Sequence, residues 1–257
     1  MKKPACVFSM MRDEALMAPH WLRYYKSIFD RTDIYVDDDQ SIDETRAILN
    51  AAGVNTQAVN RKSVAPGDFY SILRYVQCRM TELLEQYQCV LYAEADEFII
   101  PANGSLLGYM NEFVASGKPW QQTTNLEVVH DIETEPDLVL DQPWMMQRSR
   151  AINIPKFDNP QLWSVVPTWV LSFHYTEPNR QKGKGDGSLY QVHCHHIDFD
   201  TCLKRHRVRK AWNVGDTMGT RDDVILRDFF IKKKDLDASL YENCTSIEIP
   251  EVVKVAF

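Results

Sequence analysis

The sequence predicts an α/β fold with a mostly parallel central sheet flanked by helices. Over the first 120 residues, short β-prone runs alternate four times with amphipathic helical patterns. This alternation is typical of βαβ units with right-handed crossovers, which build parallel sheets. The length of 257 residues suits one large α/β domain, or one domain with a small appendage. Apolar residues at 44% and charged residues at 25% are ordinary globular values, so the chain is expected to fold.

The first two strand and helix pairs lie between residues 5 and 53. The run "ACVFSMM" is β-prone, and "EALMAPHWLRYYKSIF" carries apolar side chains at helical spacing. The run "DIYVDDD" predicts a second strand and "SIDETRAILNAAG" a second helix. We expect Ser41 to be the N-cap of that helix, Glu44 to complete a capping box, and Gly53 to end it.

The next two pairs complete the alternating half of the chain. The run "NTQAVNRK" predicts a third strand, and "DFYSILRYVQCRMTELLEQY" a long amphipathic helix. Residues 89–100, "CVLYAEADEFII", are expected to form one strand. The run "SLLGYMNEFVASG" predicts a helix that ends at a glycine.

Beyond residue 120 the pattern changes. The runs "WQQTTNLEVVHDIE" and "SLYQVHCHHIDF" predict strands, while residues 132–190 between them are rich in loop-forming residues and carry no helical pattern. The runs "DFDTCLKRHRVRKAW" and "TRDDVILRDFFIKKK" predict two further helices. We therefore expect an irregular C-terminal region.

Charge and cysteine usage bound the possible partners. A net charge of −7 and a pI near 5.5 argue against a nucleic-acid partner. Residues 202–210 are locally basic; they predict either a solvated helix face or, through 204–210, a peripheral contact with an anionic membrane. The six scattered cysteines predict reduced thiols. No secretory signal or membrane-spanning pattern is found, so we expect a cytoplasmic protein, at most peripheral to the inner face of the membrane.

Two acid clusters each follow a predicted strand. Asp37, Asp38 and Asp39 end the second strand, and Glu94, Asp96 and Glu97 interrupt the apolar run of the fourth. The carboxyl ends of parallel strands meet at one edge of a sheet, where ligands bind. Crowded carboxylates favour a counter-charge, and hard oxygen ligands suit Mg²⁺ or Mn²⁺ bridging to phosphates. The alternative is that the aspartates after the second strand are only turn and capping residues.

The segments "VFSMMRDEALMAPHWLRYYKSI", "IYVDDDQSIDET" and "LYAEADEFIIP" resemble the N-terminal half of a known family. It comprises the nucleotide-sugar-dependent glycosyltransferases of the GT-A fold, a Rossmann-like architecture, near family 2. The later "TWVLSFHY" and "DGSLYQVHCHHIDFD" are similar to the C-terminal part of bacterial family 2-like members, so the resemblance covers about residues 5–205. It implies a nucleotide-sugar-binding half, 1–120, and an acceptor-binding, metal-completing half of the same domain, 121–257.

The resemblance implies a role for each matching residue. The loop after the first strand would contact the nucleotide, as would the aspartates of "DDQSID"; the residues concerned are Ser9, Arg12, Glu14, Asp38 and Asp39. Glu94 stands where the family's acidic motif has its first Asp, and Asp96 is the expected ligand of Mn²⁺ or Mg²⁺. His193 and then His195 would complete the metal shell, because alternate strand residues share a face and His196 would point away.

The implied reaction transfers a sugar from a nucleoside diphosphate sugar to a hydroxyl of a saccharide or glycolipid acceptor, with inversion, in polysaccharide or glycolipid assembly. The favoured catalytic base is Asp131, with Asp158 and Asp186 as alternatives. Four aromatic residues suit either stacking on sugar faces or core packing: Trp144, Trp163, Trp169 and Tyr175.

Other interpretations stay open. The histidines of "HCHH" could be packed side chains, or could hold zinc with His174. The chain could also be a non-catalytic nucleotide-sugar-binding module, because Glu94 departs from the family motif. A sugar nucleotidyltransferase would use the same acidic edge, although such an enzyme normally brings a glycine-rich phosphate loop near its N-terminus.

Overall fold

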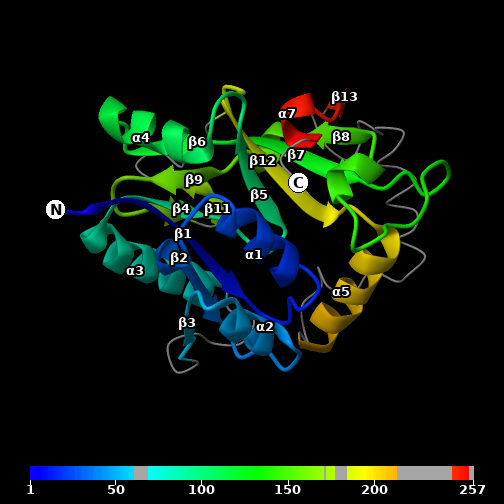
Figure 1. The fold of residues 1–257 in the computed structure, drawn as a ribbon, viewed down its shortest axis with the longest axis horizontal. Helices are drawn as coiled ribbons and strands as arrows, with labels where there is room; N and C mark the ends of the chain where they lie inside the picture. Colours follow the sequence, from blue (N-terminus) through cyan, green and yellow to red (C-terminus); the bar gives the residue numbers. More distant parts are fainter. Residues whose placement is uncertain (61–68, 171, 177–183, 213–244, 255–257) are drawn as a thin grey trace. The chain divides into compact units, whose positions relative to one another are not determined.

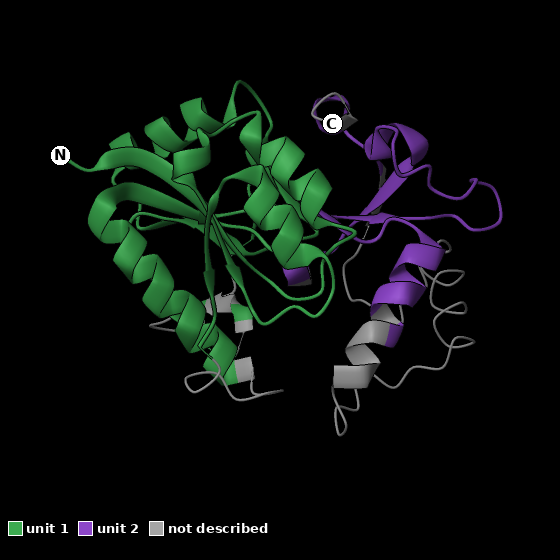
Figure 2. Ribbon diagram, turned by 60° about the horizontal axis from the view of Figure 1, so that its bottom comes forward, with its two compact units in different colours: residues 1–124, 158–191 green, residues 125–157, 192–257 purple. Residues whose placement is uncertain are grey.

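The computed structural model describes residues 1–60, 69–170, 172–176, 184–212 and 245–254. The chain forms two compact units, coloured separately in Figure 2. Unit 1 contains residues 1–124 and 158–191, and unit 2 contains residues 125–157 and 192–257. These units are defined by spatial contact. The separate division into a nucleotide-sugar-binding half, 1–120, and an acceptor-binding half, 121–257, is a prediction. The helix predicted at 220–234 lies outside the described residues.

Unit 1 is built on a six-stranded sheet in the order β3-β2-β1-β4-β9-β6 (Figure 1). Its strands are β1 (Lys3–Met11), β2 (Ile34–Asp38), β3 (Asn55–Ala58), β4 (Tyr87–Tyr92), β6 (Trp120–Gln122) and β9 (Pro160–Trp163). The first four in spatial order are parallel, and β9 runs antiparallel to both β4 and β6. The predicted α/β class with a mostly parallel sheet is therefore confirmed.

Four helices connect the strands of unit 1, as the alternation predicts. They are α1 (Ala18–Lys26), α2 (Thr45–Ala52), α3 (Phe69–Gln86) and α4 (Leu106–Ser116). Helix α4 begins at the side-chain cap of Ser105 and ends at Gly117 in the left-handed conformation. Helix α2 ends at Gly53, also left-handed, as expected.

The predicted capping box of α2 is wrong. The helix begins one turn later than expected, at Thr45, and its N-cap, Glu44, makes no side-chain cap. The Ser41 hydroxyl instead accepts the N–H of Asp13 at 3.0 Å, and an Asp43 carboxylate oxygen accepts the N–H of Thr45 at 2.9 Å. Ser41 is drawn away because the loop after β1 competes for its oxygen.

Two predicted strands are each divided in the structure. Residues 89–100 form β4 and β5 (Glu97–Pro101), separated by a turn over residues 93–96. Residues 120–133 give β6 and β7 (Thr124–Val129). Strand β5 leaves the six-stranded sheet and becomes the neighbour of β12 (Leu189–His196). The acids of the fourth predicted strand therefore lie in and beside a turn.

The core of unit 1 consists of aromatic and aliphatic side chains on both faces of the sheet. Helix α3 contributes Val76 and Met80, which pack with Phe8, Tyr92 and Trp163 in one buried cluster. Each fully buried large apolar side chain contributes roughly 1.5–3 kcal/mol through surface removed from water. Trp163 and Trp169 are core residues, and core packing is one of the two roles predicted for them.

Unit 2 is a smaller α/β unit with the strand order β13-β8-β7-β12. It adds β8 (Arg150–Asn153), β13 (Thr245–Glu248), α5 (Phe199–Trp212) and α7 (Glu251–Lys254). Strands β7 and β13 both run antiparallel to β8. Among its described residues, the region 132–190 that was expected to be irregular holds short elements: β8, β9, η2 (Trp144–Gln147), η3 (Pro155–Phe157), β10 (Trp169–Val170) and β11 (Ser172–Thr176).

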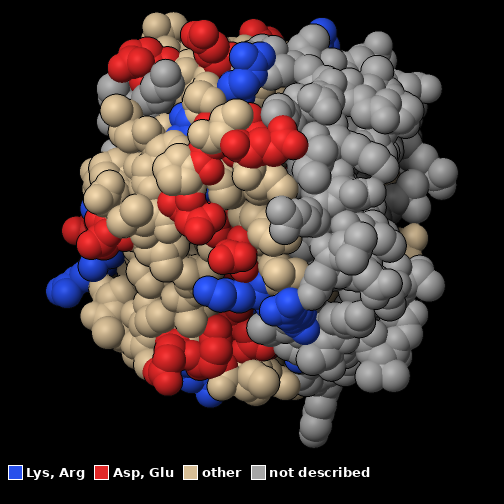
Figure 3. Space-filling model, turned by 90° about the vertical axis from the view of Figure 1, so that its right-hand side faces the viewer, with Lys and Arg blue, Asp and Glu red and all other residues tan. Residues whose placement is uncertain are grey.

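The charge of the surface and the state of the cysteines agree with what the composition predicts. On the face drawn in Figure 3, Asp and Glu side chains gather into patches, with fewer Lys and Arg side chains between them. The cysteines in the described part of the chain carry free thiols. Among the described residues, no helix has the length and apolar character needed to cross a membrane.

Candidate functional site

The carboxyl ends of β1, β2 and β4 bring the two acid clusters to one edge of the unit 1 sheet. In register, Met11 of β1 lies opposite Asp38 of β2, and Phe8 lies opposite Tyr92 of β4. Backbone hydrogen bonds continue past the strand ends, because the N–H of Asp39 donates to the Met11 carbonyl at 2.8 Å. Both acid clusters thus follow strands that flank β1.

Asp37 is committed to the protein interior. Its side chain is 1% exposed, and Oδ2 accepts the Tyr75 hydroxyl at 2.8 Å and the Gln57 amide at 3.0 Å. The Arg79 guanidinium lies 3.2 Å from the same oxygen. Burial raises the pKa of Asp37, and these hydrogen bonds and the charge of Arg79 oppose that shift. Asp37 therefore fastens α3 and β3 to the end of β2.

Asp38 also has partners within the unit. Oδ2 accepts two hydrogen bonds from Arg46, at 2.8 Å from Nε and 2.5 Å from Nη2. Oδ1 accepts the N–H of Ser41 at 3.1 Å. The Arg46 side chain is about half exposed, so this ion pair lies at the surface end of the cluster.

Asp39 differs from its neighbours in its electrostatics. Its side chain is 5% exposed, and Oδ2 lies 3.9 Å from the Arg12 guanidinium, too far for a hydrogen bond. Burial raises the pKa of Asp39 to about 6; Arg12 lowers it, while Asp38 and Asp13 raise it. This carboxyl group thus titrates close to neutral pH.

The loops after β1 and β2 interlock at this edge. The Asp13 carboxylate accepts the N–H of Ile42 at 2.6 Å, and the N–H of Glu14 donates to the Thr45 hydroxyl at 2.8 Å. Asp13 and Gln40 both have positive φ, at 51° and 57°. Such backbone conformations are uncommon outside glycine and cluster at functional sites.

Ser9 lies on β1, immediately before these loops. It is completely buried, and its hydroxyl oxygen has no hydrogen-bond partner among the described residues. A buried hydroxyl without a partner costs free energy, so the position favours a ligand or a water molecule as partner.

The acid turn after β4 divides its carboxylates between the interior and the edge. Glu97 is 3% exposed; one oxygen accepts the Gln191 amide at 2.5 Å, and the other accepts the Gln161 amide at 2.6 Å and the N–H of Glu94 at 2.9 Å. Asp96 is 3% exposed, whereas Glu94 is half-buried. Burial raises the pKa of the Tyr92 hydroxyl, and the charges of this turn raise it further.

In unit 2, a buried carboxylate holds two of the three clustered histidines. Glu127 on β7 is 1% exposed, and its Oε2 lies 2.7 Å from Nδ1 of His193. Its Oε1 is hydrogen-bonded to Nδ1 of His196. The expectation that His196 points away from His193 is therefore wrong. The reason is local: β12 ends here in a turn closed by the N–H of Ile197 and the Cys194 carbonyl, so strand alternation no longer applies.

The ring of His195 contacts the rings of both other histidines, with centroids 5.7 Å from His193 and 4.6 Å from His196. The ligand atoms of His195, His196 and Cys202 all lie within 4.8 Å of one another. A set of two imidazoles and a thiolate would suit Zn²⁺. The side chain of His174, the earlier candidate for a distal zinc ligand, lies outside the described residues.

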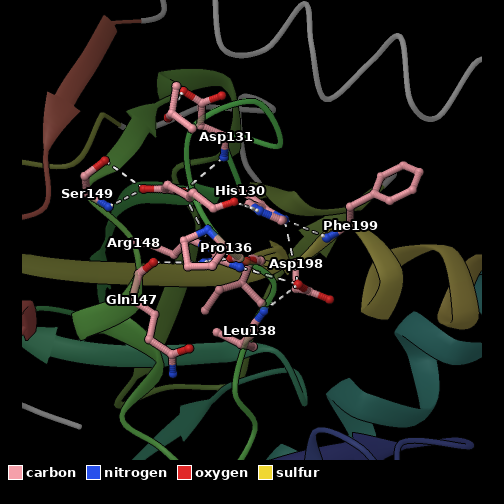
Figure 4. A network of polar contacts seen from close by, with 12 residues as sticks. His130, Asp131, Pro136, Leu138, Gln147, Arg148, Ser149, Asp198 and Phe199 are labelled. Atoms are coloured by element: carbon pink, nitrogen blue, oxygen red, sulfur yellow. Dashed lines mark hydrogen bonds and ion pairs between the residues drawn. The ribbon is translucent and has the colours of Figure 1, made fainter.

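Asp131 closes the turn that follows β7, and Figure 4 shows it with its neighbours. Its carboxylate accepts the Thr134 hydroxyl at 2.7 Å and the N–H of Glu133 at 3.2 Å. The side chain is half-buried. Of the two alternative bases, Asp158 is buried and accepts the N–H of Gly185 at 2.8 Å, and Asp186 accepts the Ser188 hydroxyl.

A second polar network in unit 2, drawn in Figure 4, is centred on Arg148, whose side chain is completely buried. Its guanidinium donates to the carbonyls of Ile197 at 2.6 Å and Pro136 at 3.1 Å, and lies 3.4 Å from Asp198. Burial acts to raise the pKa of Asp198, but hydrogen bonds from the N–H groups of Thr201 and Leu138 outweigh it and lower the pKa. This network fixes the loop before η2 and the start of α5.

Sequence patterns assign no role to Glu127, Gln161, Gln191 or Arg148. The available signal was polar residues inside strand patterns, because a buried polar side chain requires a partner. That signal identifies such residues as paired, but it does not identify their partners, which lie up to 94 residues away in the chain.

The donor atoms predicted for a divalent cation are a carboxylate of Asp96 in unit 1 and the imidazoles of His193 and His195 in unit 2. Their chemistry fits such an ion. Oxygen and imidazole ligands together suit Mn²⁺ better than Mg²⁺, which prefers oxygen ligands and water. That these three residues bind one ion is a prediction.

No protein-family model matches the chain, and no curated protein sequence matches it. Among solved structures, the chain is similar to glucosyl-3-phosphoglycerate synthase from Mycobacterium tuberculosis, in complex with Mn²⁺, UDP and glucosyl-3-phosphoglycerate. The identity is 13% over 49% of this chain and 44% of that chain, with a TM-score of 0.34. It is also similar to S. aureus TarS, at 12% identity over 94% of this chain and 44% of that chain, with a TM-score of 0.37.

A third similar structure is the mannosyltransferase PcManGT from Pyrobaculum calidifontis, in complex with GDP-Man and Mn²⁺. The identity is 12% over 51% of this chain and 36% of that chain, with a TM-score of 0.30. The chain spans less than half the length of each of these proteins. Similarity this remote gives no basis for assigning an activity.

Proposed function

We propose that the protein is a glycosyltransferase of the GT-A type, which moves a sugar from a nucleoside diphosphate sugar to an acceptor hydroxyl. One observation carries the proposal: two acid clusters follow the parallel strands that flank β1, at the edge of the sheet where α/β proteins bind ligands. In each cluster one carboxylate, Asp37 or Glu97, is committed to the interior. Asp38, Asp39, Glu94 and Asp96 are the candidates for ligand contact.

The nucleotide would bind against the loops after β1 and β2. Hydrogen bonds of Asp13 with Ser41 and Ile42 join these loops, in which Asp13 and Gln40 adopt uncommon backbone conformations. Asp38 and Asp39 would accept hydrogen bonds from the base and ribose. Ser9, Arg12 and Glu14 complete the set, and the buried hydroxyl of Ser9 would gain a partner there.

The diphosphate would lie near the turn after β4. Asp96, His193 and His195 are the residues that would hold a divalent cation, with Glu94 acting through water or a ribose hydroxyl. When bound, Mn²⁺ or Mg²⁺ stabilises the charge that develops on the leaving diphosphate.

Asp131 is the proposed base. Its contacts with Thr134 and Glu133 fix the carboxylate in one orientation, as a group that removes a proton from an acceptor hydroxyl requires. We propose inversion, because one base on the acceptor side is sufficient for it. The acceptor would be a saccharide or glycolipid in polysaccharide or glycolipid assembly. The protein would act in the cytoplasm, with residues 204–210 contacting the inner face of the membrane.

A ligand panel tests the proposal. Thermal unfolding is measured with UDP-, GDP-, dTDP- and CMP-sugars, each with and without Mn²⁺, because a ligand that binds only the folded protein raises its apparent stability. We expect one nucleotide class to raise the midpoint, and to do so only with Mn²⁺. Sugar release or transfer is then measured with that donor.

The outcomes separate the candidate functions. Donor binding with turnover supports a transferase, and binding without turnover indicates a non-catalytic module. Turnover of a sugar phosphate with a nucleoside triphosphate indicates a nucleotidyltransferase. If none of the nucleotides binds with or without the cation, the proposal is wrong.

A further inference from the structure

The hydrogen bonds of Glu127 point to a role in metal binding that no sequence pattern suggests. It lies on β7 in unit 2, it is 1% exposed, and both of its carboxylate oxygens are engaged by histidines of β12. His193 reaches Oε2 and His196 reaches Oε1, each through Nδ1. The side chains of His193 and His196 are 22% and 13% exposed, so the two rings lie between the buried carboxylate and the surface.

The hydrogen bonds determine which ring nitrogen carries the proton. With Glu127 ionised, both of its oxygens only accept hydrogen bonds, and Nδ1 is then the donor in both imidazoles. A neutral imidazole that donates through Nδ1 has its lone pair on Nε2. In that form, Nε2 of each ring is the atom with the lone pair that a metal ion would bind. This is the arrangement in which protein carboxylates orient metal-binding histidines and raise their basicity.

The carboxylate itself is held rigidly. Because each oxygen bonds a different ring, Glu127 cannot rotate without breaking one of the two contacts. Its backbone lies in β7, between β8 and β12, with Glu127 opposite Ile152 in register. A backbone hydrogen bond of 3.0 Å from His130 to the His196 carbonyl holds the ends of β7 and β12 together. A fixed carboxylate is what a precisely oriented metal ligand requires.

We propose that Glu127 is a positioning residue for the divalent cation, which fixes His193 with Nε2 directed to the metal and uses His196 as the anchor for its second oxygen. The inference rests on the proposed function for the metal, but its structural part, the proton positions of the two rings, does not. Glu127 itself would not touch the cation or the substrate.

The wild-type protein tests the structural part without any metal. With ¹⁵N-labelled histidine, long-range ¹⁵N–¹H spectra at pH 8 identify the protonated nitrogen of each ring. We expect the Nδ1–H form for His193 and His196. The Nε2–H form in His193 overturns the proposal, as does a doubly protonated ring, since neither presents a lone pair at Nε2.

Substitution tests the metal part. Glu127→Gln keeps the shape but replaces one acceptor oxygen by a donating amide, so at least one ring must change its proton position. We expect Mn²⁺ affinity, measured by electron paramagnetic resonance titration, to fall about 10- to 100-fold, the usual effect of removing such a partner. The matched control is Glu248→Gln, the same change at an exposed glutamate of β13 in unit 2. The control should leave Mn²⁺ affinity unchanged.

The failures are distinguishable. If the wild-type protein binds no Mn²⁺ but shows the Nδ1–H forms, the proposed metal site is wrong and Glu127 has only a structural role. Unchanged Mn²⁺ affinity in folded Glu127→Gln also overturns the inference. Stoichiometric zinc in the purified protein, lost in Cys202→Ser, would assign the histidines to the set that includes Cys202 and would overturn it as well.

Discussion

The two acid clusters of unit 1 look alike in sequence but differ in what stabilises them. Each aspartate at the end of β2 has an arginine nearby: Arg79 at Asp37, Arg46 at Asp38, and Arg12 3.9 Å from Asp39, the residue after the strand. Glu97, in the cluster after β4, accepts hydrogen bonds from neutral groups that include two glutamine amides and one backbone N–H. Arginines offset charge, whereas amides satisfy hydrogen bonds and leave the charge in place. The two interior carboxylates, Asp37 and Glu97, are thus stabilised by different kinds of groups, and substitutions at each cluster test whether that difference matters.

The largest expected effect is at the turn after β4. Asp96→Ala should abolish Mn²⁺-dependent nucleotide binding and leave the fold intact, because it removes the proposed carboxylate ligand. Isothermal titration calorimetry with and without Mn²⁺ measures it. The control is Glu112→Gln, an exposed acid of α4. Unchanged affinity in folded Asp96→Ala would remove the distinction between the clusters.

The next effect is on stability, and it compares the two interior carboxylates through matched isosteric changes. Asp37→Asn removes the buried charge partner of Arg79, which keeps its ion pair with the exposed Glu82. Because burial already disfavours the ionised form of Asp37, the free energy of unfolding should fall by about 2–3 kcal/mol, at the low end of the cost of breaking a buried pair. Glu97→Gln exchanges a charge among neutral amides and should cost about 1 kcal/mol. Urea unfolding at pH 7 measures both. Equal losses would show that the arginines do not distinguish the clusters.

A smaller effect concerns pH. The pKa of Asp39 is raised to about 6, so the folded protein binds this proton more tightly than the unfolded chain does. The contribution of Asp39 to stability is therefore most favourable below about pH 4, and it is lost as pH rises toward about 6. Asp39→Asn should raise the free energy of unfolding by about 2 kcal/mol at pH 7 and by almost nothing at pH 4. A pH series of urea unfolding curves that run parallel for the two proteins would contradict this.

The smallest effect is at Asp38. Asp38→Ala should weaken nucleotide and nucleotide-sugar binding alike by about tenfold, the scale of one lost hydrogen bond to a charged group. Arg46→Ala is the control for the ion pair, because it keeps the carboxylate and removes its partner. If Asp38→Ala binds the nucleoside diphosphate normally, Asp38 is only a turn residue and the β2 cluster is structural.

The sequence predicts the framework of unit 1 well, because local patterns determine it. The alternation of strand-like and helix-like hydrophobic patterns predicts the parallel strands and four helices. Gly53 and Gly117 end their helices where left-handed backbone is required. Two failures have long-range causes. Residues 89–100 read as one strand because the turn at 93–96 is stabilised by Glu97, whose amide partners lie 64 and 94 residues away. The cap at Ser41 fails because the Asp13 loop takes its hydroxyl.

For the candidate site, the sequence identifies the acids but not which of them are bonded within the protein interior and which are candidates for ligand contact. Nothing local distinguishes Asp37 from Asp39, yet one bonds Tyr75 and Gln57 and the other titrates near pH 6. The histidine cluster is found by composition alone. Its orientation by Glu127 depends on the pairing of β7 with β12, which no pattern within either strand encodes.

The place of β9 in the sheet has a consequence for biosynthesis. Strand β6, at residues 120–122, joins the sheet only through β9, at residues 160–163, and β9 also covers the edge of β4. During synthesis, about 40 further residues must therefore be added after β6 before the sheet of unit 1 can form completely. Until then β4 presents an unpaired apolar edge, the kind of surface that chaperones protect and that aggregates form on. Nascent chains halted at residue 124 should accordingly be more sensitive to protease than chains halted beyond residue 191, a difference that limited proteolysis of stalled ribosome complexes would measure.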